Sequence, residues 1–329
     1  MKVLITGGTG FIGGNLVRLL LNKGCSVRAL VRKTSSLENL EGLDVELVYG
    51  DLRDTSSLKK ACQGCDQLYH VAASYQFWSE DRQEFYESNV NGTQNILTAA
   101  RSANISKIVY TSTVGTVRYP DDPLKPSDET AFPTQKDLYN DYKRSKFQAE
   151  EVALRFAKEG LPIVIVNPSA PIGPRDIKPT PTGKIIVDFL KGKVPAYIDT
   201  GLNIVDVADV AEGHWLAAQK GKVGERYILG NENISLKEIY EMIARLTGKK
   251  PPRFQIPYTV ALTSAYGSEL IAKILQRPPS IPVGAVKMAK KYMYFNSEKA
   301  VRELGLPQSP IENAFEKAIQ WFQEHARTN

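Results

Sequence analysis

The chain has 329 residues, with 42% apolar and 24% charged side chains, a balance that excludes an intrinsically disordered protein. Its length exceeds that of one compact core, so we expect a large domain followed by a smaller one. The net charge of +6 is spread along the sequence. This pattern disfavours nucleic acid as a partner and indicates solvated surface charge with a bias toward anionic ligands such as phosphates.

Cys25, Cys62 and Cys65 are an odd number of cysteines in a long chain, which is typical of a reducing cytosol. Cys62 and Cys65 form a C-x-x-C pair, but a zinc site needs four ligands and no second pair exists, so we expect no metal. The sequence shows no signal-peptide pattern and no apolar run near the roughly 18 residues of a spanning helix. We therefore expect a cytoplasmic protein without a membrane span.

The chain opens with a predicted strand, a glycine turn and a predicted helix. Residues 3–5 are a short apolar run without helical spacing, as in a strand buried on both faces of a parallel sheet. Residues 7–10 have turn chemistry. Apolar residues then recur at helical spacing from residue 11 until Gly24 ends the pattern. Strand, glycine turn and helix together are the context in which a nucleotide-binding fingerprint is credible.

The glycines of this turn fit the spacing G-x-G-x-x-G from Gly8 and G-x-x-G-x-x-G from Gly7. A pyrophosphate must come within hydrogen-bonding distance of bare backbone N–H groups, and a helix N-terminus adds donors and a partial positive charge. We therefore predict a dinucleotide site. Its expected backbone contacts are Gly7, Gly10, Phe11, Ile12 and Gly13.

The second predicted strand covers residues 26–31 and is followed by Arg32 and Lys33. In a dinucleotide site, a carboxylate at this strand end binds the 2′-hydroxyl of NAD, whereas a cation accommodates the 2′-phosphate of NADP. No Asp or Glu stands here, so the sequence favours NADP over NAD. The alternative is that both residues are surface charges at a strand end.

A third strand over 45–49 precedes Asp51 and Leu52. Asp51 is placed to accept a hydrogen bond from the adenine amino group, and Leu52 would lie beside it. The alternative for Asp51 is a local turn in which its side chain bonds nearby backbone. Residues 55–62 are then expected to form a helix.

The fourth strand, residues 67–71, ends in small residues that would let the backbone approach the cofactor. The expected contacts are Val71, Ala72 and Ala73. His70 is expected to be packed within the strand rather than to act as a catalyst. The aromatic residues Tyr75, Phe77 and Trp78 follow in a predicted loop, where they would wall a substrate pocket or else belong to the core.

A long helix is predicted from about 81 to 103, and a fifth strand over 107–112. This alternation of strands and helices predicts a doubly wound parallel sheet with right-handed crossovers. Ligands of such sheets bind outside the carboxyl ends of the strands. The glycine turn, Arg32, Asp51, Ala72 and Thr113 all fall at such ends.

A helix expected to begin near Leu138 carries Tyr142 and Lys146, which are four residues apart and so project from one face. A tyrosine with a pKa near 10 is a poor acid or base at neutral pH. A lysine ammonium one turn away and a positive nicotinamide ring would favour the phenolate and lower that pKa. Ser112 or Thr113, at the end of the fifth strand, could polarise the oxygen of a substrate.

These motifs together resemble the extended short-chain dehydrogenase/reductase superfamily, over nearly the whole chain. The matching segments are TGGTGFIG at 6–13, GDL at 50–52, VAA at 71–73, YTST at 110–113, YKRSK at 142–146, NP at 167–168 and IVDVADV at 204–210. Through residues 164–176 and 178–183, the chain is especially similar to the dihydroflavonol-4-reductase-like branch and its bacterial relatives named hopanoid-associated sugar epimerases.

The resemblance implies a role for each residue of the motifs. Thr113 would bind the substrate oxygen, with Ser112 as the alternative because many relatives carry serine at the position of Thr113. Tyr142 would be the acid/base, and Lys146 its partner.

The same resemblance implies that the backbone around Asn167, Pro168 and Ser169 meets the nicotinamide amide. It also implies that Asn89 lies near a water relay.

After residue 168 the composition shifts toward proline, glycine and basic residues. Residues 171–182 are predicted to form a substrate loop in which Arg175, with Lys178 and Lys184, meets an anionic substrate or is simply solvated. We predict a dinucleotide-binding domain over 1–168 and a smaller, mainly helical substrate lobe over 169–329. Residues 203–230 are expected to return to the sheet.

Helical patterns support this second lobe, and Ser235 with Glu238 forms a capping box at the start of one of them. The expected helices cover 206–219, 235–246, 259–276, 297–304 and 310–325.

The sequence favours an NADP-dependent enzyme that reduces a ketone or aldehyde by hydride transfer. The alternative is an epimerase or dehydratase of a sugar nucleotide, which uses the same triad but returns the hydride. Many sugar-nucleotide enzymes carry an arginine just before the V-x-D-V segment, and residues 199–203 contain none. A nucleotide sensor without turnover has no use for an activated tyrosine. The expected partners are a small-molecule carbonyl substrate and, at most, a second copy of the chain in a homodimer.

Overall fold

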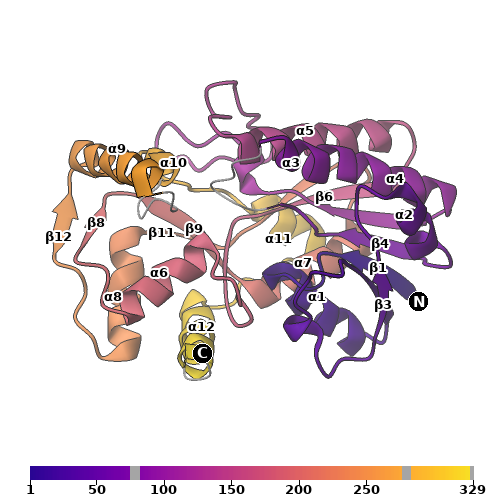
Figure 1. Ribbon diagram of the computed structural model, residues 1–329, viewed down its shortest axis with the longest axis horizontal. Coiled ribbons are helices and arrows are strands. Elements are labelled where there is room, and N and C mark those ends of the chain that lie inside the picture. The colour runs from indigo at the N-terminus through magenta and orange to yellow at the C-terminus, as the bar shows by residue number, and fades with distance from the viewer. Residues whose placement is uncertain (75–81, 276–282, 327–329) are drawn as a thin grey trace.

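The computed structural model describes residues 1–74, 82–275 and 283–326. Its larger part is a seven-stranded sheet in which every neighbouring pair is parallel, in the order β10-β6-β5-β4-β1-β2-β3 (Figure 1). The prediction of a doubly wound parallel sheet is confirmed. The strands are β1 (Lys2–Thr6), β2 (Ser26–Val31), β3 (Val45–Tyr49), β4 (Gln67–His70), β5 (Lys107–Thr111), β6 (Ile163–Pro168) and β10 (Arg226–Leu229).

Helices cover both faces of this sheet and bury alternate residues of each strand. Val3 and Ile5 of β1 belong to one core, whereas Leu4 points into the core on the other face. All three side chains are fully buried, which explains why the strand has a continuous apolar run instead of an alternating pattern. The first core lies under α1 (Phe11–Asn22), α7 (Val207–Lys220) and α11 (Glu298–Leu304), and the second under α2 (Thr55–Cys62), α4 (Gly92–Ser102) and α5 (Asp141–Lys158).

Two predicted helices differ from the observed ones. The helix expected over 81–103 consists of α3 (Arg82–Phe85), the π-helical turn η2 (Tyr86–Asn91) and α4. The wider turn is associated with Asn89, whose buried side chain bonds the backbone of Ser74 and the hydroxyl of Ser145. The helix expected near Leu138 begins only at Asp141, because Asn140 caps it by accepting a bond from the Lys143 amide at 2.8 Å.

The second lobe contains more strand than its sequence pattern predicts. A three-stranded sheet has the order β11-β9-β7, and β12 pairs with β8. These strands are only three to six residues long, which is too short for a readable alternation. They are β7 (Ala170–Ile172), β8 (Ala196–Ile198), β9 (Gly201–Asp206), β11 (Glu232–Ser235) and β12 (Phe254–Ile256).

The helices α6 (Pro181–Leu190), α8 (Leu236–Thr247) and α12 (Ile311–Ala326) pack around a third core. The helices α9 (Tyr258–Leu275) and α10 (Val283–Met288) pack against each other in a separate small core. The predicted capping box at Ser235 and Glu238 is confirmed. The loop expected over 171–182 is observed over 173–180, between the end of β7 and the start of α6, which Thr180 caps. None of the helices in the described ranges is both long and apolar enough to span a bilayer.

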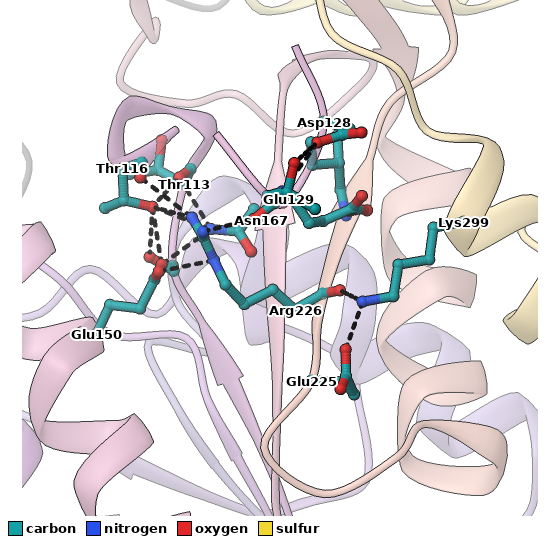
Figure 2. A network of polar contacts seen from close by, with 12 residues as sticks. Thr113, Thr116, Asp128, Glu129, Glu150, Asn167, Glu225, Arg226 and Lys299 are labelled. Atoms are coloured by element: carbon teal, nitrogen blue, oxygen red, sulfur yellow. Dashed lines mark hydrogen bonds and ion pairs between the residues drawn. The ribbon is translucent and has the colours of Figure 1, made fainter. Parts of the chain in front are cut away.

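A buried polar network ties α5 to the edge of the large sheet (Figure 2). Arg226 of β10 and Glu150 of α5 form an ion pair with Nε and Oε1 2.9 Å apart, and their side chains are only 5% and 2% exposed. The Thr116 hydroxyl and the Asn167 amide both donate to Oε2 of Glu150, at 2.7 and 2.9 Å. The Asn167 amide also donates to the carbonyl of Thr113. The network therefore fixes the turn after β5 against α5.

Replacing Glu150 with Gln should lower the free energy of unfolding by about 3–5 kcal/mol, because Arg226 would then be a buried charge without a counter-charge. Urea denaturation measures this. The matched control is Glu159→Gln, which removes an exposed ion pair with Arg101 and should cost only about 0–1 kcal/mol. Equal losses in the two variants would contradict a structural role for the buried pair.

Candidate active site

The glycine turn after β1 leaves no room for side chains. Gly7 has φ of +74°, and a Cβ there would lie 2.6 Å from the amide nitrogen of Ala72. A Cβ on Gly13 would overlap the carbonyl oxygen of Gly7. Gly10 precedes α1 and offers no capping side chain to its first N–H groups. A bare turn before an uncapped helix N-terminus fits the pyrophosphate of a dinucleotide, with Phe11 and Ile12 in the first helical turn.

The next two strand ends carry the residues predicted to face adenosine. Arg32 and Lys33 follow β2 and are exposed. The Asp51 carboxylate accepts bonds from the backbone and guanidinium of Arg53, all at 2.9 Å, and these bonds lower the pKa of Asp51. This is the local turn that the sequence left open as the alternative. Leu52 is buried in the core.

Val71, Ala72 and Ala73 continue directly from β4 and are held against the end of β1. The Val71 amide donates to the Thr6 carbonyl at 3.1 Å, and the Ala72 amide donates to the Thr6 hydroxyl at 3.2 Å. The contact between Ala72 and Gly7 brings this segment beside the glycine turn. Position 7 therefore has no room for a side chain where the two strand ends meet.

His70 is packed, in the place that the sequence predicts. Its ring is 1% exposed, and its two nitrogens share hydrogen bonds with the hydroxyls of Thr6 and Thr93. Burial, with a smaller contribution from Lys146, lowers the pKa of His70 to about 3. The imidazole is therefore neutral at physiological pH and has no free nitrogen with which to exchange a proton.

The end of β5 and the first turn of α5 bring a threonine and a tyrosine together. Thr113 caps the short turn η3 (Val114–Thr116), and its hydroxyl accepts a bond from the Gly115 amide at 3.1 Å. The hydroxyl of Tyr142 shares a hydrogen bond with Thr113. The buried hydroxyl of Ser112 instead lies 3.4 Å from that of Thr116. The geometry thus favours Thr113 over Ser112 as the partner of the tyrosine.

Lys146 lies one turn after Tyr142 and is buried. Its ammonium donates to the Thr111 carbonyl at 2.9 Å and to the Tyr110 hydroxyl at 3.4 Å. Burial lowers the pKa of Lys146 to about 8, and the opposing charge of Glu150 limits this decrease.

The pKa of Tyr142 is raised, whereas the sequence predicts a lowered value. Burial raises the pKa of Tyr142, and the bond with Thr113 only partly opposes this increase. Burial is the largest contribution to the pKa of Tyr142, and the Lys146 ammonium is bound by Thr111 and Tyr110. The tyrosine is therefore protonated at neutral pH in this structure.

The end of β6 places Asn167 and Ser169 beside the same edge of the sheet. Asn167 is fully buried, and its amide holds the Thr113 carbonyl at 3.1 Å. Pro168 is the last residue of the strand, and the amide and hydroxyl of Ser169 both donate to the Leu229 carbonyl.

Arg175 lies against α1 rather than beside Tyr142. Its backbone has φ of +75°, its guanidinium donates to Oδ1 of Asn15 at 3.1 Å, and its carbonyl accepts a bond from Asn39. Asn39 also donates to the carbonyls of Thr9 and Gly10, so Arg175 is joined to the glycine turn. The predicted pocket residues Tyr75, Phe77 and Trp78 lie outside the described residues.

Sequence reasoning missed two groups that support the site. Asn15 and Asn39 form hydrogen bonds with the segment around Arg175, and no sequence pattern predicts these contacts. Glu150 could have been found, because it follows Lys146 by four residues and so lies on the same helix face as the catalytic candidates. Over the described part of the chain, no cluster of three or more His, Cys, Asp or Glu side chains could hold a metal ion.

Comparison with known proteins agrees with this geometry. Residues 3–230 match the NAD dependent epimerase/dehydratase family. A Synechocystis sp. protein with the provisional name dihydroflavonol 4-reductase is 50% identical, over 98% of this chain and 94% of that protein. The solved structure of gox2253 is 43% identical, with a TM-score of 0.88 and coverage of 99% of both chains.

Two further relatives extend over most of the chain. Sterol demethylase protein B of Methylococcus capsulatus is 35% identical, over 98% of this chain and 99% of its own. The 4-hydroxy-2-methyl-3-oxo-4-farnesyl-3,4-dihydroquinoline-1-oxide ketoreductase of Stigmatella aurantiaca is 33% identical, over 93% of this chain and 91% of its own. The chain therefore belongs to the NAD dependent epimerase/dehydratase family and is an NAD(P)-dependent oxidoreductase of the extended short-chain dehydrogenase/reductase type.

Proposed function

We propose that the protein is an NADP-dependent reductase that converts a ketone or aldehyde to an alcohol. The observation that carries this proposal is the hydrogen bond between Tyr142 and Thr113, with Lys146 one helical turn away. When bound, the reduced nicotinamide supplies the hydride. The side chains of this chain bind the substrate oxygen and deliver the proton that completes the alcohol.

Each residue of the triad has one task in this reaction. Thr113 donates a hydrogen bond to the carbonyl oxygen and orients it. Tyr142 transfers its phenolic proton to that oxygen as negative charge develops there. Lys146 has a pKa of about 8, so its ammonium is mostly charged at neutral pH and stabilises the phenolate that forms.

The direction of the reaction is supported by protonation and by the cations near β2. The raised pKa of Tyr142 keeps the phenol protonated, which suits a proton donor in a net reduction. The exposed charges of Arg32 and Lys33 suit a 2′-phosphate, and NADPH is the common donor for reduction. The names of the Synechocystis and Stigmatella relatives are those of reductases. The alternative is an NAD(P)-dependent sugar-nucleotide epimerase or dehydratase, which the name of the family supports.

The proposed substrate is apolar around its carbonyl. Relatives at 33% and 35% identity carry names that refer to a farnesylated ring and to a sterol. The stretch at the start of β9 contains no arginine for the diphosphate of a sugar nucleotide, since residues 199–203 are Asp, Thr, Gly, Leu and Asn. Both observations favour a lipid-like carbonyl compound.

Tyr142→Phe should lower turnover by about 10²-fold or more, because it keeps the ring but removes the proton donor. NADPH binding should persist. Tyr139→Phe is the matched control, since the buried Tyr139 hydroxyl has no hydrogen-bond partner among the described residues. Steady-state kinetics of both variants check this, and near-normal turnover in Tyr142→Phe would remove Tyr142 from its role.

Arg32→Asp should abolish or reverse a preference for NADPH over NADH, since it replaces a cation near the 2′-phosphate with a repelling carboxylate. Fluorescence titration gives both affinities in the two proteins. Lys59→Asp, an exposed charge change on α2, should leave the preference intact. Equal affinities for NADPH and NADH in the unmodified protein would refute the assignment of Arg32.

Purified protein should consume NADPH in a one-to-one ratio with alcohol formed, for example from a 3-ketosteroid or from farnesal. The reason is that a reductase releases oxidised cofactor in each cycle. NADPH absorbance and product chromatography measure the two amounts. Tightly retained NAD⁺, with interconversion of UDP-sugars and no net cofactor change, would move the assignment to the epimerase.

A further inference from the structure

The outer side of helix α9 is an exposed face without charge. Between residues 258 and 272, the exposed positions are Thr259, Val260, Thr263, Ser264, Tyr266, Gly267, Leu270 and Ile271. At roughly 100° per residue these positions fall on one side of the helix. Four of them are large apolar side chains that are 51–63% exposed. Exposed helix faces of globular proteins are usually polar or charged, so this face is unusual.

The inner side of α9 packs against α10. Ala261 and Ala265 are buried against Val283 and Val286 of α10. The carboxylate of Glu269 accepts a bond from the Val283 amide at 2.9 Å, so it is directed toward α10. Apart from Glu269, the only charged residue in the sequence of α9 is Lys273, which follows the last exposed apolar position. The contacts with α10 therefore do not account for the apolar residues on the outer side of α9.

Positive charges flank this face. Lys287 of α10 and Lys290 in the turn that follows α10 are exposed, and within the described ranges neither forms an ion pair. The Lys287 ammonium lies 6.0 Å from the ring of Tyr266, and that of Lys290 lies 5.8 Å from the ring of Tyr258. Apolar side chains, tyrosines and unpaired lysines thus occur together on α9, α10 and the turn that follows α10.

Figure 1 shows α9, α10 and β12 together at the end of the molecule away from the seven-stranded sheet. Phe254, in β12, is 73% exposed. Nothing in the described part of the chain covers the outer side of α9. The surface is therefore accessible to a large partner.

We propose that the outer face of α9, with Lys287 and Lys290, binds the surface of a lipid bilayer that contains anionic headgroups. Apolar side chains enter the boundary between headgroups and acyl chains, tyrosines prefer the headgroup level, and lysines are attracted to the anionic surface. A second copy of this chain is the less favoured occupant. A symmetric contact through this face would bring the unpaired lysines of two copies together, and Glu269, the one acidic residue in the sequences of α9 and α10, is already bound to the Val283 amide.

Vesicle flotation with the full chain tests this proposal, using phosphatidylcholine vesicles with and without phosphatidylglycerol. The unmodified protein should float with the anionic vesicles. Combined Leu270→Glu and Ile271→Glu should reduce the bound fraction about ten-fold or more, because two charges enter the apolar face. The matched control is Leu124→Glu, since Leu124 is 89% exposed but lies elsewhere, and it should bind normally.

The lysines are tested separately. Combined Lys287→Glu and Lys290→Glu should remove the dependence on phosphatidylglycerol. Combined Lys59→Glu and Lys60→Glu, which makes the same charge change on α2, should preserve it. NADPH titration of every variant confirms that the cofactor site is folded, so the vesicle test does not depend on the proposed reduction.

Three outcomes would overturn the proposal. The first is that the unmodified protein does not bind anionic vesicles. The second is that the Leu270 and Ile271 variant binds as well as the Leu124 control. The third is that light scattering shows a dimer that the Leu270 and Ile271 changes dissociate, which would assign the face to a second copy.

Discussion

The geometry of the candidate site depends on the buried ion pair between Glu150 and Arg226. Two charges removed from water need partners on all sides, and here Thr116 and Asn167 supply hydrogen bonds to the carboxylate. Since the four residues come from α5, β10, η3 and β6, satisfying the pair sets the relative positions of these elements. Asn167 also holds the carbonyl of Thr113. The backbone of Thr113 is therefore held by a residue that also binds a buried charge.

Burial also determines the protonation states of the ionisable side chains in the candidate site. It raises the pKa of Tyr142, lowers that of Lys146 to about 8 and lowers that of His70 to about 3. A protonated phenol beside a charged ammonium can deliver a proton without first losing one. An enzyme that begins by oxidising an alcohol needs the phenolate first, and burial opposes its formation. The protonated phenol is compatible with the proton donation that the proposed reduction requires.

The sequence predicted the large sheet well because its strands are buried on both faces. Strands β2 and β3 were predicted residue by residue, since apolar runs end at charged or glycine residues. Short strands such as β7 were not predicted, because three residues cannot show the alternation of apolar and polar side chains that marks a strand. The place of Arg175 beside α1 could not be read either, since it depends on how a segment 160 residues away in sequence from Asn15 folds back. The buried ion pair likewise joins residues whose contact only the fold creates.

The bilayer face and the proposed substrate follow from one physical constraint. A sterol-like or prenylated carbonyl compound partitions into membranes, so an enzyme that acts on it must collect it there. Strand β7 begins two residues after β6 ends, so the lobe that carries α9 starts directly at the catalytic edge of the sheet. Arg32 follows β2, which lies toward the opposite edge of the sheet from β6. Under the two proposals above, the cofactor would exchange with water toward the β2 side of the sheet, and an apolar substrate would enter through the lobe that carries α9.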